Sequence, residues 1–316
     1  MDITVLVPLY NEVDSLDELA RWIDEVMNNH QFQYEIIFVD DGSDDGSWEK
    51  IKQLRQNNPN IRGLSFRKNY GKSAALHMGF REANGDVVIT MDADLQDSPE
   101  EIPDLYKMIQ EDNYDMISGW KKKRFDRITK TIPSKFFNKT ARIVTGIKLH
   151  DFNCGLKAYK NDVVKSIEVY GEMHRYIPVI AKRAGFTKIG EKVVQHQKRK
   201  YGITKFGIDR FIKGFLDLMS ITFITKFGKR PMHLFGTIGT AIFTIGVLAA
   251  AWLGGTKLYY LHNNIPAKLV TDSPYFYIAL TCMIIGTQLF VAGFLGELVS
   301  RSSDSRDQYN VKDKLD

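Results

Sequence analysis

Apolar and polar residues alternate in blocks along the first third of the chain. Short apolar runs occupy residues 3–8, 34–39, 61–66, 85–91 and 115–118. Such runs, rich in Val and Ile, are typical of strands buried on both faces of a sheet. Between them, residues 15–28, residues 99–111 and a segment ending near residue 83 are predicted to form helices. This order predicts an α/β fold with a mostly parallel, Rossmann-like sheet and helices on both faces.

The hydrophobic pattern changes in the last third of the chain. Residues 231–256 and 273–296 contain no Asp, Glu, Lys or Arg. Each run exceeds the roughly 20 residues that a helix needs to cross a bilayer. A buried core helix would explain one such run, but two in succession predict transmembrane helices at about 231–256 and 274–299. Residues 205–229 carry an apolar stripe at helical spacing, which predicts an amphipathic helix in the membrane interface, with core packing as the alternative.

The expected organisation is a globular domain at 1–204, the juxtamembrane helix at 205–229, the two spans within 231–299, and a tail at 300–316. Basic residues flank the spans on the side of both termini, and the chain opens directly with a strand-like run rather than a signal peptide. The positive-inside rule then places both termini and the globular domain in the cytosol. We therefore expect an integral membrane protein.

Composition narrows the possible classes of function. Charged residues make up 26% and apolar residues 44% of the 316 positions, which is ordinary for a folded protein and excludes a disordered chain. The two cysteines, Cys154 and Cys282, stand far apart, so neither a disulfide framework nor a zinc cluster is expected. The sequence has no P-loop, because Phe66 stands where that motif needs glycine before Gly71-Lys72-Ser73.

The strongest candidate site follows the buried strand at 85–91. It reads Asp92-Ala93-Asp94-Leu95-Gln96-Asp97. Like charges this close repel one another unless a cation lies among them, and hard oxygen ligands favour Mg²⁺ or Mn²⁺. Ligands of open α/β sheets bind at the carboxyl ends of strands. The segment therefore predicts a metal that holds a diphosphate, and the alternative is a solvated loop.

Two further clusters leave alternatives open. Asp40-Asp41-Gly42-Ser43 follows the second strand and suits a tight turn as well as a ligand site. Residues 121–142 contain nine Lys or Arg and a single acid, Asp126. Such a segment can be a solvated surface or attract nucleic acid. Because two spans place it near a membrane, anionic headgroups or a phosphate are the expected partners, and nucleic acid is not.

Four segments in order resemble family 2 glycosyltransferases with the GT-A fold. They are Val7-Pro8-Leu9-Tyr10-Asn11-Glu12, Asp40-Asp41-Gly42-Ser43, the segment Asp92–Glu100, and Arg199-x-x-Gly202-x-Thr204-Lys205. Within that family the chain is similar to polyprenyl-phosphate glycosyltransferases, including bacterial undecaprenyl-phosphate glucosyltransferases and dolichyl-phosphate mannose synthases. The resemblance covers about residues 1–230. The two spans at the C-terminus fit the bacterial branch, so the resemblance implies a bacterial inner membrane as the location.

The resemblance implies roles for particular residues. Asp92, Asp94 and Gln96 would hold the metal. Lys121 stands where the family usually has arginine, which keeps the charge but loses bidentate recognition of phosphate. The implied nucleotide-sugar contacts are Pro8, Tyr10, Glu12, Asp40, Asp41, Asp92, Ala93, Asp94, Gln96, Lys121, Arg199 and Lys205.

The predicted acceptor site consists of the basic segment at 121–142 and one acid, Asp151. Arg124, Arg127 and Lys135 are expected to bind the acceptor phosphate, because the donor diphosphate already has other cationic partners. Asp151 is the candidate catalytic carboxylate together with the metal ligand Asp94, although a turn cap would explain Asp151 equally well.

The implied activity is metal-dependent, inverting transfer of a sugar from a nucleotide-sugar, UDP-glucose or a related UDP-hexose, to a polyprenyl phosphate on the cytosolic membrane face. A processive polysaccharide synthase is one alternative, but its Gln-x-x-Arg-Trp motif is absent from the sequence. A membrane protein that binds nucleotide-sugar without catalysis is the other. A homo-oligomer is possible, because two spans alone bury little protein surface.

Overall fold

The computed structural model describes residues 1–122, 138, 140–143, 145–171, 173–197, 200, 223, 231–266 and 268–301. The chain divides into two units, Met1–Thr222 and Phe223–Asp316, and each is described by itself. Three predicted segments lie outside the described residues. They are the interfacial helix, of which only Phe223 is described, the tail from residue 302 onward, and most of the basic segment at 121–142.

The first unit is built on a seven-stranded sheet. Six strands are parallel, and β6 runs antiparallel between β4 and β5. The order across the sheet is β3 (Ile61–Ser65), β2 (Tyr34–Asp40), β1 (Ile3–Leu9), β4 (Val87–Thr90), β6 (Lys157–Lys160), β5 (Met116–Trp120) and β7 (Ile189–Val193). The expectation of a mostly parallel α/β sheet is confirmed.

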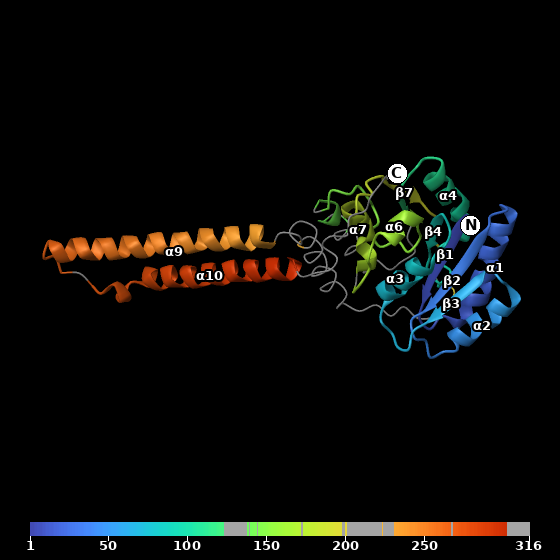
Figure 1. Cartoon of the computed structure of the whole chain (residues 1–316), viewed down its shortest axis with the longest axis horizontal. Coiled ribbons are helices and arrows are strands. Elements are labelled where there is room, and N and C mark those ends of the chain that lie inside the picture. The colour runs from blue at the N-terminus through green and yellow to red at the C-terminus, as the bar shows by residue number, and fades with distance from the viewer. Residues whose placement is uncertain are drawn as a thin grey trace. The chain divides into compact units, whose positions relative to one another are not determined.

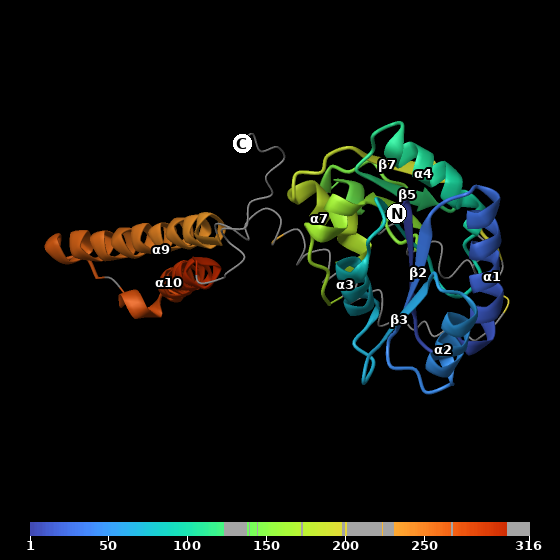
Figure 2. The ribbon, with the colours of Figure 1, turned by 45° about the vertical axis from the view of Figure 1, so that its right-hand side comes forward.

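Helices cover both faces of this sheet (Figure 1, Figure 2). Because side chains of a strand alternate between faces, each central strand contributes side chains to two hydrophobic cores, one on each face of the sheet. Val5 and Phe38 pack with one set of helices, whereas Leu6 and Ile37 pack with the other. The first set is α1 (Val13–Asn29), α2 (Ser47–Asn57) and α4 (Ile102–Gln110), which follows the short η1 (Pro99–Glu101); the second is α3 (Lys72–Glu82), α6 (Asn161–Lys165) and α7 (Ile177–Arg183), preceded by η2 (Met173–Tyr176).

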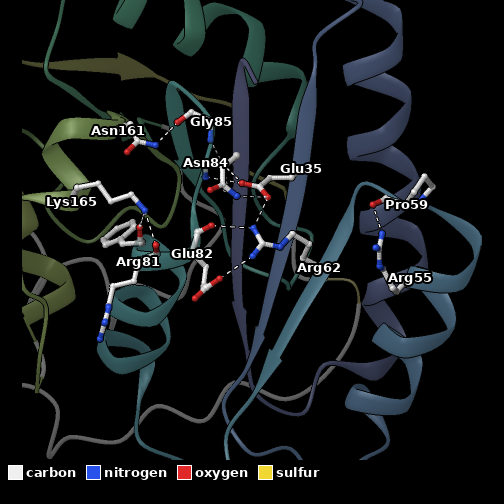
Figure 3. A network of polar contacts seen from close by, with 12 residues as sticks. Glu35, Arg55, Pro59, Arg62, Arg81, Glu82, Asn84, Gly85, Asn161 and Lys165 are labelled. Atoms are coloured by element: carbon white, nitrogen blue, oxygen red, sulfur yellow. Dashed lines mark hydrogen bonds and ion pairs between the residues drawn. The ribbon is translucent and has the colours of Figure 1, made fainter.

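A polar network closes the amino edge of the sheet (Figure 3). Glu35, only 3% exposed, accepts hydrogen bonds from Thr4 Oγ1 at 2.7 Å and from the Asn84 N–H at 2.8 Å. Arg62 binds Glu35 at 2.8 Å and also reaches Glu82 at the end of α3, again at 2.8 Å. Burial would raise the pKa of Glu35, but these donors hold it below its ordinary value. The network therefore joins β1, β2, β3 and α3 at the edge opposite the candidate site.

The second unit contains two long helices, α9 (Pro231–His262) and α10 (Pro274–Arg301), with the short η3 (Val270–Asp272) before α10. Both are long and apolar enough to cross a membrane. Glycines allow the helices to pack closely, because a Cβ on Gly239 would lie 2.6 Å from the Gly286 carbonyl oxygen. Large apolar side chains such as Leu248 and Phe294 are more than half exposed, as expected for a surface that faces lipid.

Candidate active site

The loop after β1 is tied to the loop after β2. Asn11 has a left-handed backbone (φ +55°), and this conformation allows its side chain and N–H to bond to the neighbouring loop. Tyr10 stays 37% exposed at this edge, whereas Pro8 is buried within β1. The bonds between the loops are Asn11 N–H to Ser43 Oγ (2.9 Å), Asn11 Nδ2 to Asp44 Oδ1 (2.7 Å), Asp44 N–H to Asn11 Oδ1 (3.0 Å), Glu12 N–H to Ser47 Oγ (3.2 Å) and Val13 N–H to Asp45 Oδ2 (3.0 Å).

The buried acids Asp40 and Asp41 hold the neighbouring backbone in place. Asp40 accepts hydrogen bonds from the Ser43 N–H at 3.0 Å and from Ser65 Oγ at 2.9 Å. Asp41 accepts the N–H groups of Tyr70 at 2.7 Å and Gly71 at 2.9 Å. Burial raises the pKa of Asp41 even though these N–H groups oppose the shift. Both acids thus make turn contacts, and their contact with a nucleotide stays a prediction.

The predicted metal segment forms a turn at the carboxyl end of β4. Leu95 adopts a left-handed backbone (φ +59°), which is uncommon outside glycine and is often found at functional sites. Its side chain is 3% exposed in the core, and Ala93 is likewise buried. The Gln96 N–H donates to Asp94 Oδ1 at 3.2 Å. Burial of the two apolar side chains therefore fixes the turn and leaves Asp92, Asp94 and Gln96 partly accessible.

Asp92 lies among cationic groups. Lys72, the first residue of α3, forms an ion pair with Asp92 Oδ1. Burial alone would raise the pKa of Asp92, but Lys72, Lys121 and Lys157 together hold it well below its usual range. On its other side Asp92 packs on Gly155, where an added Cβ would lie 2.4 Å from Asp92 Oδ2. Asp92 is thus charged at neutral pH and fixed in position.

Asp94 and Asp97 differ in their partners. Asp97 is fully buried and lies 2.6 Å from Lys121 Nζ. Burial would lower the pKa of Lys121, but Asp97 raises it above its ordinary value. Burial, with the charges of Asp92 and Asp97, raises the pKa of Asp94 to about 6. Lys121 is therefore brought to the predicted site through Asp97, while the negative charge of Asp94 lacks an ion-pair partner among the described residues.

These residues fit a divalent cation that is shared with a ligand. Within the described residues, no three His, Cys, Asp or Glu side chains are grouped so that they could hold a metal by themselves. Mg²⁺ is usually bound through one or two carboxylates together with substrate phosphates. Asp92 and Asp94 provide two carboxylates. Burial, and after it the charges of Asp92 and Asp97, raises the pKa of Asp94, and a bound cation would favour its charged form.

A second group of polar residues lies in the loop before β6, against β5 and β7. Asp151 is 1% exposed and accepts the Asn153 N–H at 3.0 Å, which is the geometry of a turn cap. Glu191 accepts the N–H groups of His150 at 2.7 Å and Asp151 at 3.1 Å. The His150 ring stacks on Trp120, with centroids 4.1 Å apart. A turn role for Asp151 is therefore observed, and its catalytic role stays a prediction.

A small cavity lies beneath Asp92. Its volume is about 20 Å³, which is room for about one water molecule. Lys157 lines it, is 4% exposed and donates a hydrogen bond to the Cys154 carbonyl. Burial lowers the pKa of Lys157 and raises that of the Cys154 thiol to about 12, so this cysteine stays protonated. Lys72 and Lys157 were not among the predicted site residues, although Gly71-Lys72-Ser73 already marked a basic helix start.

The chain that leaves β7 runs beside the Asp92–Asp97 turn. The Gln197 N–H donates to the Gln96 carbonyl at 2.9 Å, and the backbones of Asp97 and His196 form an isolated antiparallel β-bridge. Arg199 follows two residues later but, like Lys205, lies outside the described residues. Arg124, Arg127 and Lys135 of the basic segment are outside them too.

Comparison with known proteins identifies the family of the chain. The family model for glycosyl transferase family 2 matches residues 4–168. The chain is 31% identical over 322 residues to a dodecaprenyl-phosphate galacturonate synthase of Rhizobium johnstonii, a match that covers 100% of this chain and 94% of that protein. It is 33% identical over 302 residues to an undecaprenyl-phosphate 4-deoxy-4-formamido-L-arabinose transferase of Pseudomonas syringae pv. syringae, covering 95% and 86% of the two chains.

Two solved structures share the fold. Glucosyl-3-phosphoglycerate synthase of Mycobacterium tuberculosis, in complex with Mn²⁺, UDP-glucose and phosphoglyceric acid, has a TM-score of 0.53 at 17% identity, covering 71% of this chain and 79% of that chain. Mannosyl-3-phosphoglycerate synthase of Rubrobacter xylanophilus has a TM-score of 0.57 at 13% identity, covering 71% and 74%. These structures confirm the GT-A fold, and the family match shows that the chain belongs to glycosyl transferase family 2.

Proposed function

We propose that this chain transfers a sugar from a nucleotide-sugar to a polyprenyl phosphate at the cytosolic face of a bacterial inner membrane. The observation that carries the proposal is the carboxylate turn Asp92–Asp97 at the carboxyl edge of a GT-A sheet, in a chain with two helices long enough to cross a bilayer. The relatives named above support the acceptor class, since their names specify dodecaprenyl and undecaprenyl phosphate.

The donor site rests on the metal turn and on the loops after β1 and β2. Asp92, Asp94 and Gln96 would hold Mg²⁺ or Mn²⁺, which supplies neutralisation of the charge that develops on the departing nucleoside diphosphate. Pro8 and Asp40 lie near the carboxyl ends of β1 and β2, and Tyr10, Glu12, Asp41 and Ala93 follow β1, β2 and β4. These six residues would contact the nucleotide. Lys121, Arg199 and Lys205 would complete the phosphate contacts. The Mn²⁺ bound together with UDP-glucose in the Mycobacterium tuberculosis synthase supports a divalent ion in this fold.

The acceptor phosphate would be the nucleophile. Its second pKa is about 6, so it is largely ionised at neutral pH and needs no strong base. Its oxygen would form the new bond to the anomeric carbon while the bond to the diphosphate oxygen breaks, and a single displacement inverts that carbon. Arg124, Arg127 and Lys135 would bring the second anion close. Asp151 would orient these cations or accept a proton.

The sugar is the least constrained part of the proposal. A UDP-hexose such as UDP-glucose is our first candidate donor. The relatives' names specify a galacturonate and a formamido-arabinose, so a uronic acid and an amino-pentose belong in the same panel.

The test is transfer by the purified full chain in detergent. Labelled nucleotide-sugars of this panel are incubated with undecaprenyl phosphate and Mn²⁺, and the organic phase is analysed by mass spectrometry. We expect one sugar to appear on the lipid phosphate as a single residue. A labelled polymer would favour a processive synthase, and binding of nucleotide-sugar without any product would favour a protein without catalysis.

A further inference from the structure

Lys72 is held in a fixed place at the start of α3. Its neighbour Gly71 has a left-handed backbone (φ +93°), which opens the turn into the helix. The N–H groups of Tyr70 and Gly71 are both bound by the buried carboxylate of Asp41. The backbone before Lys72 is therefore anchored to β2, and the lysine extends from this anchor to Asp92.

The partner of Lys72 is a carboxylate that would also bind the cation. About one third of each side chain is exposed, 33% for Lys72 and 34% for Asp92, so a ligand can reach the pair. An ammonium group and a divalent cation at one carboxylate repel each other strongly at a few ångströms. Occupation of Asp92 by Lys72 therefore opposes binding of the cation.

The other charges of the turn further weaken binding of a cation in the absence of a nucleotide. Asp97 already has Lys121 as its partner, so among the described residues only Asp94 of the three acids lacks an ion pair. One uncompensated carboxylate attracts a divalent cation weakly. A nucleoside diphosphate would favour binding of the cation at Asp92, because its oxygens can bind both the cation and the displaced ammonium.

We propose that Lys72 is a positioning residue that competes with the divalent cation for Asp92, and that the donor diphosphate relieves this competition by accepting the ammonium. The second part rests on the proposed function. The consequence is coupled binding: the cation binds weakly to the donor-free protein and tightly together with the nucleotide. Such coupling is reciprocal, so the cation strengthens nucleotide binding by the same factor.

The test measures Mn²⁺ affinity rather than activity. Free Mn²⁺ is followed by electron paramagnetic resonance with the full chain in detergent, with and without UDP. The variants are Lys72→Met, which removes the charge, and Lys72→Arg, which keeps it; Lys72→Gln replaces Lys72→Met if that variant fails to fold. Lys50→Met is the matched control, because Lys50 forms an exposed ion pair with Asp17 at 2.9 Å.

Without UDP, we expect Lys72→Met to bind Mn²⁺ at least about tenfold more tightly than the wild type, since a nearby positive charge is removed. UDP should then tighten Mn²⁺ binding less in this variant than in the wild type. Lys72→Arg and Lys50→Met should resemble the wild type. Unchanged or weaker Mn²⁺ binding in Lys72→Met, or an equal change in Lys72→Arg, would overturn the inference.

The outcomes also separate this inference from the proposed function. If the wild type transfers no sugar but Lys72→Met binds Mn²⁺ more tightly, the competition for Asp92 stands and the proposed function fails. If the wild type transfers sugar and Lys72→Met leaves Mn²⁺ affinity unchanged, the function stands and the competition is wrong.

Discussion

Gly155→Ala should damage the site while leaving the fold intact. The added Cβ would lie 2.4 Å from Oδ2, 2.6 Å from Cγ and 2.8 Å from Oδ1 of Asp92. Non-bonded heavy atoms normally stay about 3.5 Å apart, so the carboxylate must move by about 1 Å. The backbone of Gly155 cannot easily yield, because its carbonyl accepts a hydrogen bond from Thr90 Oγ1 at 2.9 Å.

A displacement of about 1 Å at a catalytic contact can cost about a hundredfold in rate, which sets the expected loss of turnover. Mn²⁺ affinity in the presence of UDP should fall with it. Transfer kinetics and electron paramagnetic resonance measure the two effects, and thermal unfolding checks the fold. Gly155 does not require a left-handed backbone, so alanine should cause little strain of its own.

Gly79→Ala is the matched control. Its added Cβ would lie 2.2 Å from Leu6 Cδ1 in the core, away from the carboxylate turn. We expect a loss of about 1–3 kcal/mol in unfolding free energy through overpacking, with Mn²⁺ affinity preserved in the folded protein. Full turnover in Gly155→Ala, or loss of stability without loss of Mn²⁺ binding, would refute the assigned role of Asp92.

Three further predictions follow from the network, the basic segment and the spans. Glu35→Gln should lower the unfolding temperature at pH 7, and the difference from the wild type should shrink as the pH falls below 4.5. The pKa of Glu35 is lower in the folded protein than its ordinary value of 4.5, so the carboxylate stabilises the fold above pH 4.5, and this stability is lost as it protonates. A difference that stays constant with pH would contradict this reasoning. Replacing Arg124 and Arg127 by Gln should raise the KM for lipid acceptor and leave donor affinity nearly unchanged in calorimetry; the reverse pattern would assign the basic segment to the donor. In a background without the native cysteines, Cys at Asn263 should react with an impermeant thiol reagent in intact cells and Cys at Ser305 should not, whereas the opposite pattern would reverse the predicted topology.

The first half of the sheet could be predicted because its strands are strong local signals. β1 and β2 are mostly apolar and are buried throughout, so the apolar runs in the sequence were enough to locate them. β6 was not predicted: it has four residues, two of them lysine, and exists because it pairs with β4 and β5. β7 carries Glu191 and Lys192 among its five residues and is no more apolar. Pairing over long sequence distances leaves little trace in such short segments.

The site shows the same division. The acids after β4 could be identified because they follow a buried strand closely and are dense in charge. Lys72 could not, because a single lysine at a helix start has no periodicity, and only the fold brings it to Asp92. The acids after β2 were ambiguous in sequence for a physical reason: Asp44 and Asp45 tie two loops, while Asp40 and Asp41 cap backbone N–H groups at the edge of the site.

The most direct measurement is Mn²⁺-dependent transfer of the productive sugar to undecaprenyl phosphate, compared between the full-length wild type and Asp94→Asn. The variant keeps the shape of the side chain and removes one charge from the proposed metal site. We predict no lipid product in excess chelator and recovery on addition of Mn²⁺. Asp94→Asn should need more than about tenfold more Mn²⁺ and turn over more than about tenfold more slowly. Full wild-type turnover in chelator, or an Asp94→Asn variant with normal Mn²⁺ dependence and rate, would contradict a catalytic cation at this turn.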